Sequence, residues 1–295
     1  MLLGAILLAL HPLPGSGQLP PRLQNCSGHP IYPYVPAPTR DDKPDPKVSI
    51  EDVAFQGEMD LPESIKEQLV GAVEQTSFES ASDWINALEE IVRNELEQHG
   101  YFYAQVTAEP RVISTEPETI RVSVTFQINE GEQYRLSEIR FKNANVFPAE
   151  QLRSQFALQD GDIFNLQKIR QGLEALVRLY GRYGYINLTA SPDLYSDRSH
   201  RLISMIVELD SGIQFRVGSV EIFGLDPKIV NNVLKTKLRQ GDVFDSKLVH
   251  DFFIDNKSVL PVDASEVDDL WIKQNPAKST VAIVLDFRTC PRDSM

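Results

Sequence analysis

The sequence has few basic residues and no long apolar segment after its first ten residues. Lysine and arginine total 29 against 42 acidic residues, which gives a formal net charge of −13. Nucleic acids and anionic lipids are usually bound through clustered Lys and Arg, so this balance argues against both classes of partner. Beyond the start, no segment is apolar enough for a membrane span in the mature chain. A content of 42% hydrophobic and 24% charged residues is ordinary for a folded protein.

The sequence also lacks the residue patterns on which catalysis depends. Its five histidines are scattered, without a His-Glu-x-x-His pattern or a pair at metal-ligand spacing. No nucleophile elbow, phosphate-binding loop or dinucleotide glycine pattern is present. His99 stands beside Gly100, an arrangement typical of a helix end, where the dipole favours a cation. We therefore expect no enzymatic activity, no cofactor and no metal site.

Only two cysteines occur, Cys26 and Cys290, near opposite ends of the chain. Neither has a second cysteine or a histidine at zinc-ligand spacing. In an oxidising compartment they could form a disulfide, which would contribute about 5 kcal/mol through chain entropy because the closed loop is long. Pairing and separate thiols both fit the sequence.

The first 47 residues have the pattern of an export signal followed by an extended lead. Residues 2–10 are apolar, which is too short for a bilayer span but suits the core of a secretory signal, although no Lys or Arg precedes them. A frayed apolar terminus is the alternative. Ten of the 19 prolines lie between residues 12 and 46 and disfavour helix and sheet bonding there. We expect a signal peptide over residues 1–17, a disordered Pro-rich lead over residues 18–47, and an exported chain.

A thirteen-residue stretch recurs along the chain. Residues 131–143 match residues 212–224, with Ile139 and Phe141 replaced by Val220 and Ile222, and a weaker copy contains Val53 and Phe55. A Gly-Asp-x-Phe turn also recurs about eighty residues apart, and repeat 1 lacks it. Such self-similarity predicts a tandem array. We expect repeat 1 over residues 48–131, repeat 2 over 132–211, a degenerate repeat 3 over 212–290, and a tail over 291–295. The structural motif positions are Gly131, Gly161, Asp162, Phe164, Gly184, Tyr185, Gly212, Gly241, Asp242 and Phe244.

Within each repeat the periodicity predicts strand, helix, helix, strand, strand. In repeat 2, Ile169, Leu173, Leu176 and Tyr180 form one apolar helix stripe, which ends at Gly184-Tyr185. Repeat 3 loses this Gly-Tyr ending. The fold class predicted is α+β.

These motifs, in their order and spacing, resemble the polypeptide-transport-associated (POTRA) repeats of outer-membrane protein assembly factors and two-partner secretion transporters. The resemblance covers nearly all of residues 48–290. It implies three small domains, each with two helices packed on a three-stranded mixed sheet whose second strand lies along one edge. It also implies a periplasmic role in binding unfolded outer-membrane proteins or accessory subunits. Family transporters continue into a β-barrel that the five residues after Cys290 cannot supply. We therefore expect either a stand-alone array that serves a separate outer-membrane β-barrel, or a fragment.

Mapped by position, the edges implied by the resemblance are residues 103–108, 186–191 and 267–274. Backbone hydrogen bonds are independent of side-chain identity, so one edge can accept many client strands by strand addition. The alternatives are shielded edges that serve only the fold, or a structural module that docks on one fixed envelope partner or on the cell wall. The residues expected to contact a partner are Tyr103, Gln105, Thr107, Asn187, Leu188, Thr189 and Ser191.

Overall fold

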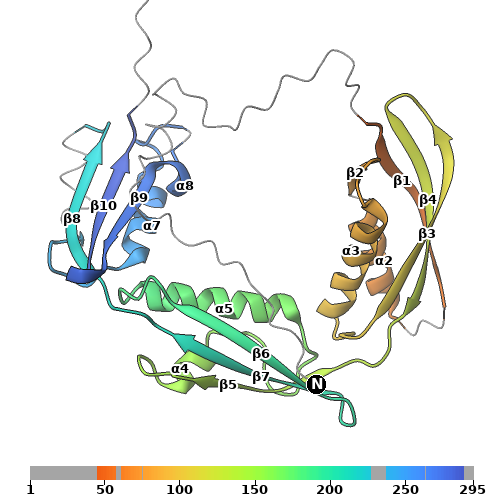
Figure 1. The fold of residues 1–295 in the computed structure, drawn as a ribbon, viewed down its shortest axis with the longest axis horizontal. Helices are drawn as coiled ribbons and strands as arrows, with labels where there is room; N and C mark the ends of the chain where they lie inside the picture. Colours follow the sequence, from red (N-terminus) through yellow and green to blue (C-terminus); the bar gives the residue numbers. More distant parts are fainter. Residues whose placement is uncertain (1–44, 58–60, 75, 227–236, 263, 289–295) are drawn as a thin grey trace, which may run out of the picture.

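The computed structural model describes residues 45–57, 61–74, 76–226, 237–262 and 264–288. These residues form three small α+β repeats that follow one another along an arc (Figure 1), with the helices α3, α5 and α7 toward its inner side and the sheets toward its outer side. The expected signal peptide, nearly all of the Pro-rich lead, both cysteines and the tail lie outside the described residues.

Repeat 1 has a four-stranded sheet in the order β2-β1-β4-β3. Strand β1 runs parallel to β4, and β3 runs antiparallel to it. The prediction of three strands was wrong for this repeat, because residues 77–79 form a short extra strand in which Phe78 pairs with Val48. Its elements are β1 (Lys47–Gln56), α2 (Glu63–Glu74), β2 (Ser77–Glu79), α3 (Trp84–Gln98), β3 (Gln105–Thr115) and β4 (Thr119–Asn129).

Repeat 2 has the expected three-stranded sheet, in the order β5-β7-β6. Its main helix begins where the Asn165 side chain accepts a hydrogen bond from Lys168 N at 2.8 Å. The predicted stripe from Ile169 to Tyr180 is buried, and each of its large apolar side chains stabilises the fold by about 1.5–3 kcal/mol. Its elements are β5 (Arg135–Lys142), α4 (Ala149–Arg153), α5 (Leu166–Gly181), β6 (Thr189–Asp197) and β7 (Leu202–Asp210).

Repeat 3 repeats this sheet in the order β8-β10-β9. Asp245 caps its main helix by accepting from Lys247 N at 2.9 Å, as Asn165 does in repeat 2. Its described elements are β8 (Arg216–Phe223), α7 (Ser246–Asp255), α8 (Glu266–Asp269), β9 (Leu270–Asn275), the 3₁₀ helix η1 (Pro276–Lys278) and β10 (Thr280–Asp286).

The structure confirms an α+β tandem array in which the last strand of each repeat is central and the strand before it, β3, β6 or β9, lies at a sheet edge. The edge strands begin later than expected, however. β3 begins at Gln105, β6 begins at Thr189, and β9 begins at Leu270 because the short helix α8 precedes it.

Each repeat buries its own apolar core between its helices and one face of its sheet. The cores centre on Leu88 and Phe126 in repeat 1, Phe164 and Leu176 in repeat 2, and Phe244 in repeat 3, all fully buried. Within the part of the chain that the structure describes, no helix is both long and apolar enough to traverse a bilayer.

Candidate functional site: repeat junctions and sheet edges

Repeats 1 and 2 are joined by hydrogen bonds that use the recurring thirteen-residue motif. The amide of Tyr134, just before β5, donates to the carbonyl of Gly100, just after α3, over 2.8 Å. The preceding side chain adds a second bond, because Gln133 Nε2 donates to the carbonyl of His99 over 2.9 Å. The motif at the start of repeat 2 therefore binds the open carbonyl end of a helix in repeat 1.

Repeats 2 and 3 are joined in the same way. The amide of Phe215 donates to the carbonyl of Gly184 over 2.8 Å. Gln214 Nε2 donates to the carbonyl of Tyr183 over 2.9 Å. The recurrence of Gln and an aromatic residue thus has a physical reason, since the same two bonds set the spacing at both junctions.

Both junctions require glycine at the helix end. Gly100 and Gly184 have φ angles of 86° and 82°, a left-handed conformation that disfavours other residues. A Cβ atom on Gly100 would lie 2.9 Å from the carbonyl oxygen of Tyr134, and one on Gly184 would lie 2.5 Å from that of Phe215. The close approach of the next repeat therefore excludes a side chain at either position.

The Gly-Asp-x-Phe turn and the first strand form one structure, although Arg135 at the start of the strand and Gly161 in the turn are 26 residues apart in the sequence. In repeat 2, Gly161 N donates to Leu136 O over 2.7 Å, Leu136 N donates to Asp162 O over 2.9 Å, and Phe164 N donates to Tyr134 O over 3.0 Å. The turn therefore covers the free side of β5 at its start. In repeat 3 the same three bonds join Gly241 and Val217, Val217 and Asp242, and Phe244 and Phe215.

Repeat 1 replaces this turn with strand β2. Ser77, Phe78 and Glu79 pair with the first residues of β1, at the place where repeats 2 and 3 use their Gly-Asp turns. The absence of the Gly-Asp motif from repeat 1 is thereby explained, because another segment covers the same edge.

Tyr103, expected on a partner-binding edge, instead lies in the junction between repeats 1 and 2. Its ring packs against Tyr134 with centroids 5.4 Å apart, and the guanidinium of Arg198 lies 4.7 Å from its centroid. Its hydroxyl donates to Ser196 Oγ in β6 over 2.7 Å. Phe102 packs edge-on against Phe164 with centroids 5.7 Å apart.

Asn187 occupies the corresponding place in the next junction. It exchanges two side-chain hydrogen bonds with Gln274 in β9, of 2.9 and 3.0 Å. Leu188 is buried in the core of repeat 2 before β6 begins. The other expected contact residues lie on edge strands with exposed side chains; they are Gln105 and Thr107 in β3 and Thr189 and Ser191 in β6.

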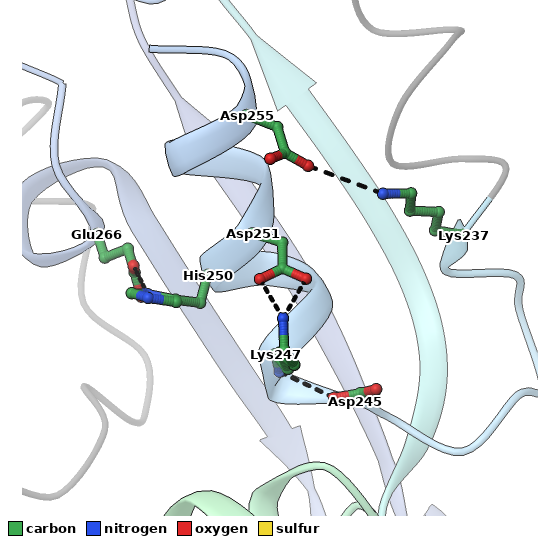
Figure 2. Close-up of polar contacts among 7 residues, drawn as sticks. All are labelled: Lys237, Asp245, Lys247, His250, Asp251, Asp255 and Glu266. Atoms are coloured by element: carbon green, nitrogen blue, oxygen red, sulfur yellow. Dashed lines mark hydrogen bonds and ion pairs between the residues drawn. The ribbon is translucent and has the colours of Figure 1, made fainter.

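A cleft of about 590 Å³ lies between α5 of repeat 2 and α7 of repeat 3. Its basic side chains have acidic neighbours. Lys247 contacts both carboxylate oxygens of Asp251, at 2.5 and 2.6 Å, and His250 Nδ1 lies 2.5 Å from Glu266 Oε1 (Figure 2). The charges on this wall of the cleft therefore largely compensate one another.

A serine, a histidine and an aspartate meet in the loop between β6 and β7. Asp197 Oδ1 accepts from Ser199 Oγ over 2.6 Å, and His200 Nδ1 lies 2.7 Å from Asp197 Oδ2 and 3.0 Å from Ser199 Oγ. The bond from Ser199, followed by those from His200, holds the pKa of Asp197 well below its usual range. All three residues are exposed to solvent. The trio is a hairpin turn stabilised by side chains.

Among the described residues, no three His, Cys, Asp or Glu side chains lie close enough together to bind one metal ion.

Comparison with known proteins gives matches over most of the folded chain. The sequence pattern of the POTRA family, described as surface antigen variable number repeat, matches residues 48–131 and 134–212. A Treponema pallidum relative, provisionally named as an outer membrane protein assembly factor, is 25% identical over 201 residues, which are 65% of this chain and 24% of that protein. The outer membrane protein assembly factor BamA of Buchnera aphidicola is 26% identical over 163 residues, which are 54% of this chain and 26% of that protein. The chain spans about a quarter of the length of these relatives.

The crystal structure of POTRA3-5 of Haemophilus influenzae BamA has a similar fold. Its TM-score with this chain is 0.58 at 19% sequence identity, and the match covers 82% of this chain and 96% of that one. The similarity therefore extends over the array and not over one repeat alone.

Proposed function

Because the chain belongs to the POTRA family, we propose that it is a non-enzymatic periplasmic scaffold for the assembly or secretion of outer-membrane proteins. It binds unfolded or partly folded clients, or a separate outer-membrane assembly partner. The names of its relatives, which are outer membrane protein assembly factors, support this assignment.

Binding occurs by addition of a client strand to a sheet edge. The observation that carries this proposal is that the last strand but one of every repeat, β3, β6 or β9, has a sheet neighbour on one side only. The backbone groups on the other side can form a new ladder with an extended segment of almost any sequence. This suits a protein that handles many clients.

The magnitudes favour weak, rapidly reversible binding at each edge. A ladder hydrogen bond contributes about 0.5–1.5 kcal/mol net, so five or six bonds yield only several kcal/mol. Association costs about 4–15 kcal/mol in lost freedom, which offsets much of that gain. Because the junction bonds hold the repeats at a fixed spacing, a client that reaches a second site on the array is retained longer.

Docking on one fixed envelope partner is the second candidate function. The cleft between α5 and α7 favours it, because a partner seated there would contact two repeats at once. Such a partner would be folded and bound at fixed stoichiometry, unlike the clients of a strand-addition site.

Site-specific photocrosslinking of the full chain in cells tests the proposal. The crosslinkable residue replaces Arg111, Tyr195 or Lys273, exposed residues of the three edge strands, and Gln171, exposed on α5, serves as a matched control. We expect unfolded outer-membrane proteins to be captured from at least one edge position and not from Gln171. Capture from none of the edges would refute strand addition, and capture of one folded protein through Gln171 would favour the fixed-partner function.

A further inference from the structure

The three edge strands can be compared position by position. Phe55, Phe141 and Ile222 are the same position of the recurring motif, and the central strand of each sheet pairs with them in register. Residues that lie opposite one another across the strands of a sheet form a row. The edge-strand residue in the row of Phe55, Phe141 or Ile222 is therefore equivalent in the three repeats. These rows contain Ala108 opposite Phe126, Pro192 opposite Val207, and Leu270 opposite Leu285.

The direction of the edge amides is fixed by one contact in repeat 1. The amide of Ala108 donates to Glu89 Oε1, on α3, over 2.9 Å, so it faces away from β4. Backbone direction alternates along a strand, so every second residue also faces outward. Counted from this shared row, three outward positions follow in each strand: 108, 110 and 112 in β3; 192, 194 and 196 in β6; and 270, 272 and 274 in β9. β3 and β6 each have one further outward position before the row, Val106 and Ala190.

In β3, two of the three outward amides are closed to a partner. Glu89 occupies the amide of Ala108, and Pro110 has no amide hydrogen. Free donors remain only on either side of this closed pair, at Val106 and Val112. A side chain and a proline that protect an edge in this way are known devices against unwanted strand pairing.

In β6, the first outward position is Pro192, which again has no amide hydrogen to donate. The proline ring also stands where a partner backbone would approach. Outward donors remain at Ala190, Leu194 and Ser196, but Pro192 interrupts their series, whereas the series in β9 is unbroken.

In β9, all three outward positions keep their amides. Residues 270–275 contain no proline, and no described side chain accepts a hydrogen bond from the backbone of Leu270, Ile272 or Gln274. Lys273 is exposed and has no ion-pair partner among the described residues, and half-buried Trp271 precedes it by two positions on the same outer face.

We propose that β9 is the strand that receives client segments, and that β3 and β6 are protected edges. The client is an extended polypeptide segment with an apolar side chain beside Trp271 and an acidic side chain beside Lys273, since such cross-strand pairs stabilise a ladder. This inference rests on the proposed function and assigns it to one repeat. The three repeats then have different roles, with repeats 1 and 2 positioning repeat 3.

The test compares capture yields from the matched positions Arg111, Tyr195 and Lys273, which lie between the second and third outward residues of their strands. We expect capture chiefly through Lys273. Gln274→Pro removes an outward donor and should reduce that capture about 2- to 12-fold, the equivalent of one ladder bond. Gln274→Ala keeps the donor and loses the same side-chain bonds to Asn187, so the fall in capture from Gln274→Ala to Gln274→Pro measures the loss of the donor alone.

Pro192→Ala provides the reverse test, because it restores a donor to β6. Capture through Tyr195 should rise by a similar factor. Equal capture at all three positions in the unaltered chain would overturn the assignment to β9 while leaving the proposed function in place, whereas capture at none would overturn the proposed function itself. Amide exchange of β10 in the Gln274→Pro chain verifies that repeat 3 is folded, and equal capture by Gln274→Pro and Gln274→Ala would also contradict the inference.

Discussion

Replacing Gly184 with alanine should separate repeat 2 from repeat 3 without unfolding either. The new Cβ would lie 2.5 Å from the carbonyl oxygen of Phe215, well inside contact distance, so the first residues of repeat 3 must move. That movement breaks the bond from the Phe215 amide to residue 184, together with the bond from Gln214 to Tyr183.

The expected magnitude follows from a matched control, Gly161→Ala. Gly161 has a φ of 90°, similar to the 82° of Gly184, but a Cβ atom there would meet nothing within 4 Å. Both variants carry the cost of a left-handed alanine, about 1–2 kcal/mol. Only Gly184→Ala also loses two junction bonds of about 0.5–1.5 kcal/mol each, so it should be less stable at the junction by about 1–3 kcal/mol.

Amide hydrogen exchange of the full chain measures this difference at one atom. In Gly184→Ala, the Phe215 amide should exchange about 5- to 150-fold faster than in Gly161→Ala, the kinetic equivalent of that free energy. The Tyr134 amide, which makes the same bond at the other junction, should be unchanged. Equal protection of Phe215 in the two variants would refute the assignment of these bonds as the link between repeats.

Four further substitutions test local features of the fold. Tyr180→Phe should raise the free energy of unfolding in urea by about 1 kcal/mol, because the buried hydroxyl has no hydrogen-bond partner among the described residues; a loss of stability would reveal one. The depressed pKa of Asp197 means that its contribution to stability is present above the usual carboxyl pKa and lost as pH falls below about 4. The protection of the hairpin amides, relative to their intrinsic exchange rates, should therefore fall there in the native chain and show no such dependence in Asp197→Asn. Gly172→Ala should lower the free energy of unfolding by about 1–3 kcal/mol, because its Cβ would lie 2.2 Å from a phenylalanine ring. Gly71→Ala, where a Cβ atom would meet open space, should raise the free energy of unfolding by about 0.5–1 kcal/mol in the same assay.

Much of the fold could be predicted from the sequence because the signals are local. The buried stripe of α5 and the capping residues Asn165 and Asp245 act within a few residues of their own position. The recurrence of the thirteen-residue stretch then supplied the repeat, and with it the element order of repeat 2 and, apart from the extra strand β2, of repeat 1. The start of the edge strands was wrong by two or three residues, because residues such as Tyr103 follow the glycine and pack on the next repeat before β3 begins.

The features that matter for binding depend on contacts between distant residues. Strand β2 is short and polar, so nothing in its sequence indicated that it would pair with β1. The bond between Glu89 and the Ala108 amide joins a helix to a strand. The sequence does not show that this bond occupies an amide that faces away from β4. Pro110 and Pro192 can be read from the sequence. Only the strand register shows that each lies at a position where the edge strand faces away from its neighbour.

The role of the recurring Gln and aromatic residues could not be predicted from the sequence either. Their recurrence marked them as structural, yet the partners of Gln133 and Gln214 are carbonyl groups of the preceding repeat, which carry no sequence signal. The same is true of Asn187, whose partner Gln274 lies 87 residues away.

The most direct measurement for the central claim is amide exchange of the full chain with and without a bound, urea-released outer-membrane protein. Addition of a strand to β9 should slow exchange at Leu270, Ile272 and Gln274, the amides that face outward from that edge, and leave Val106 in β3 and Ala190 in β6 unchanged. Slower exchange confined to the helices around the α5–α7 cleft, with β9 unaffected, would contradict it.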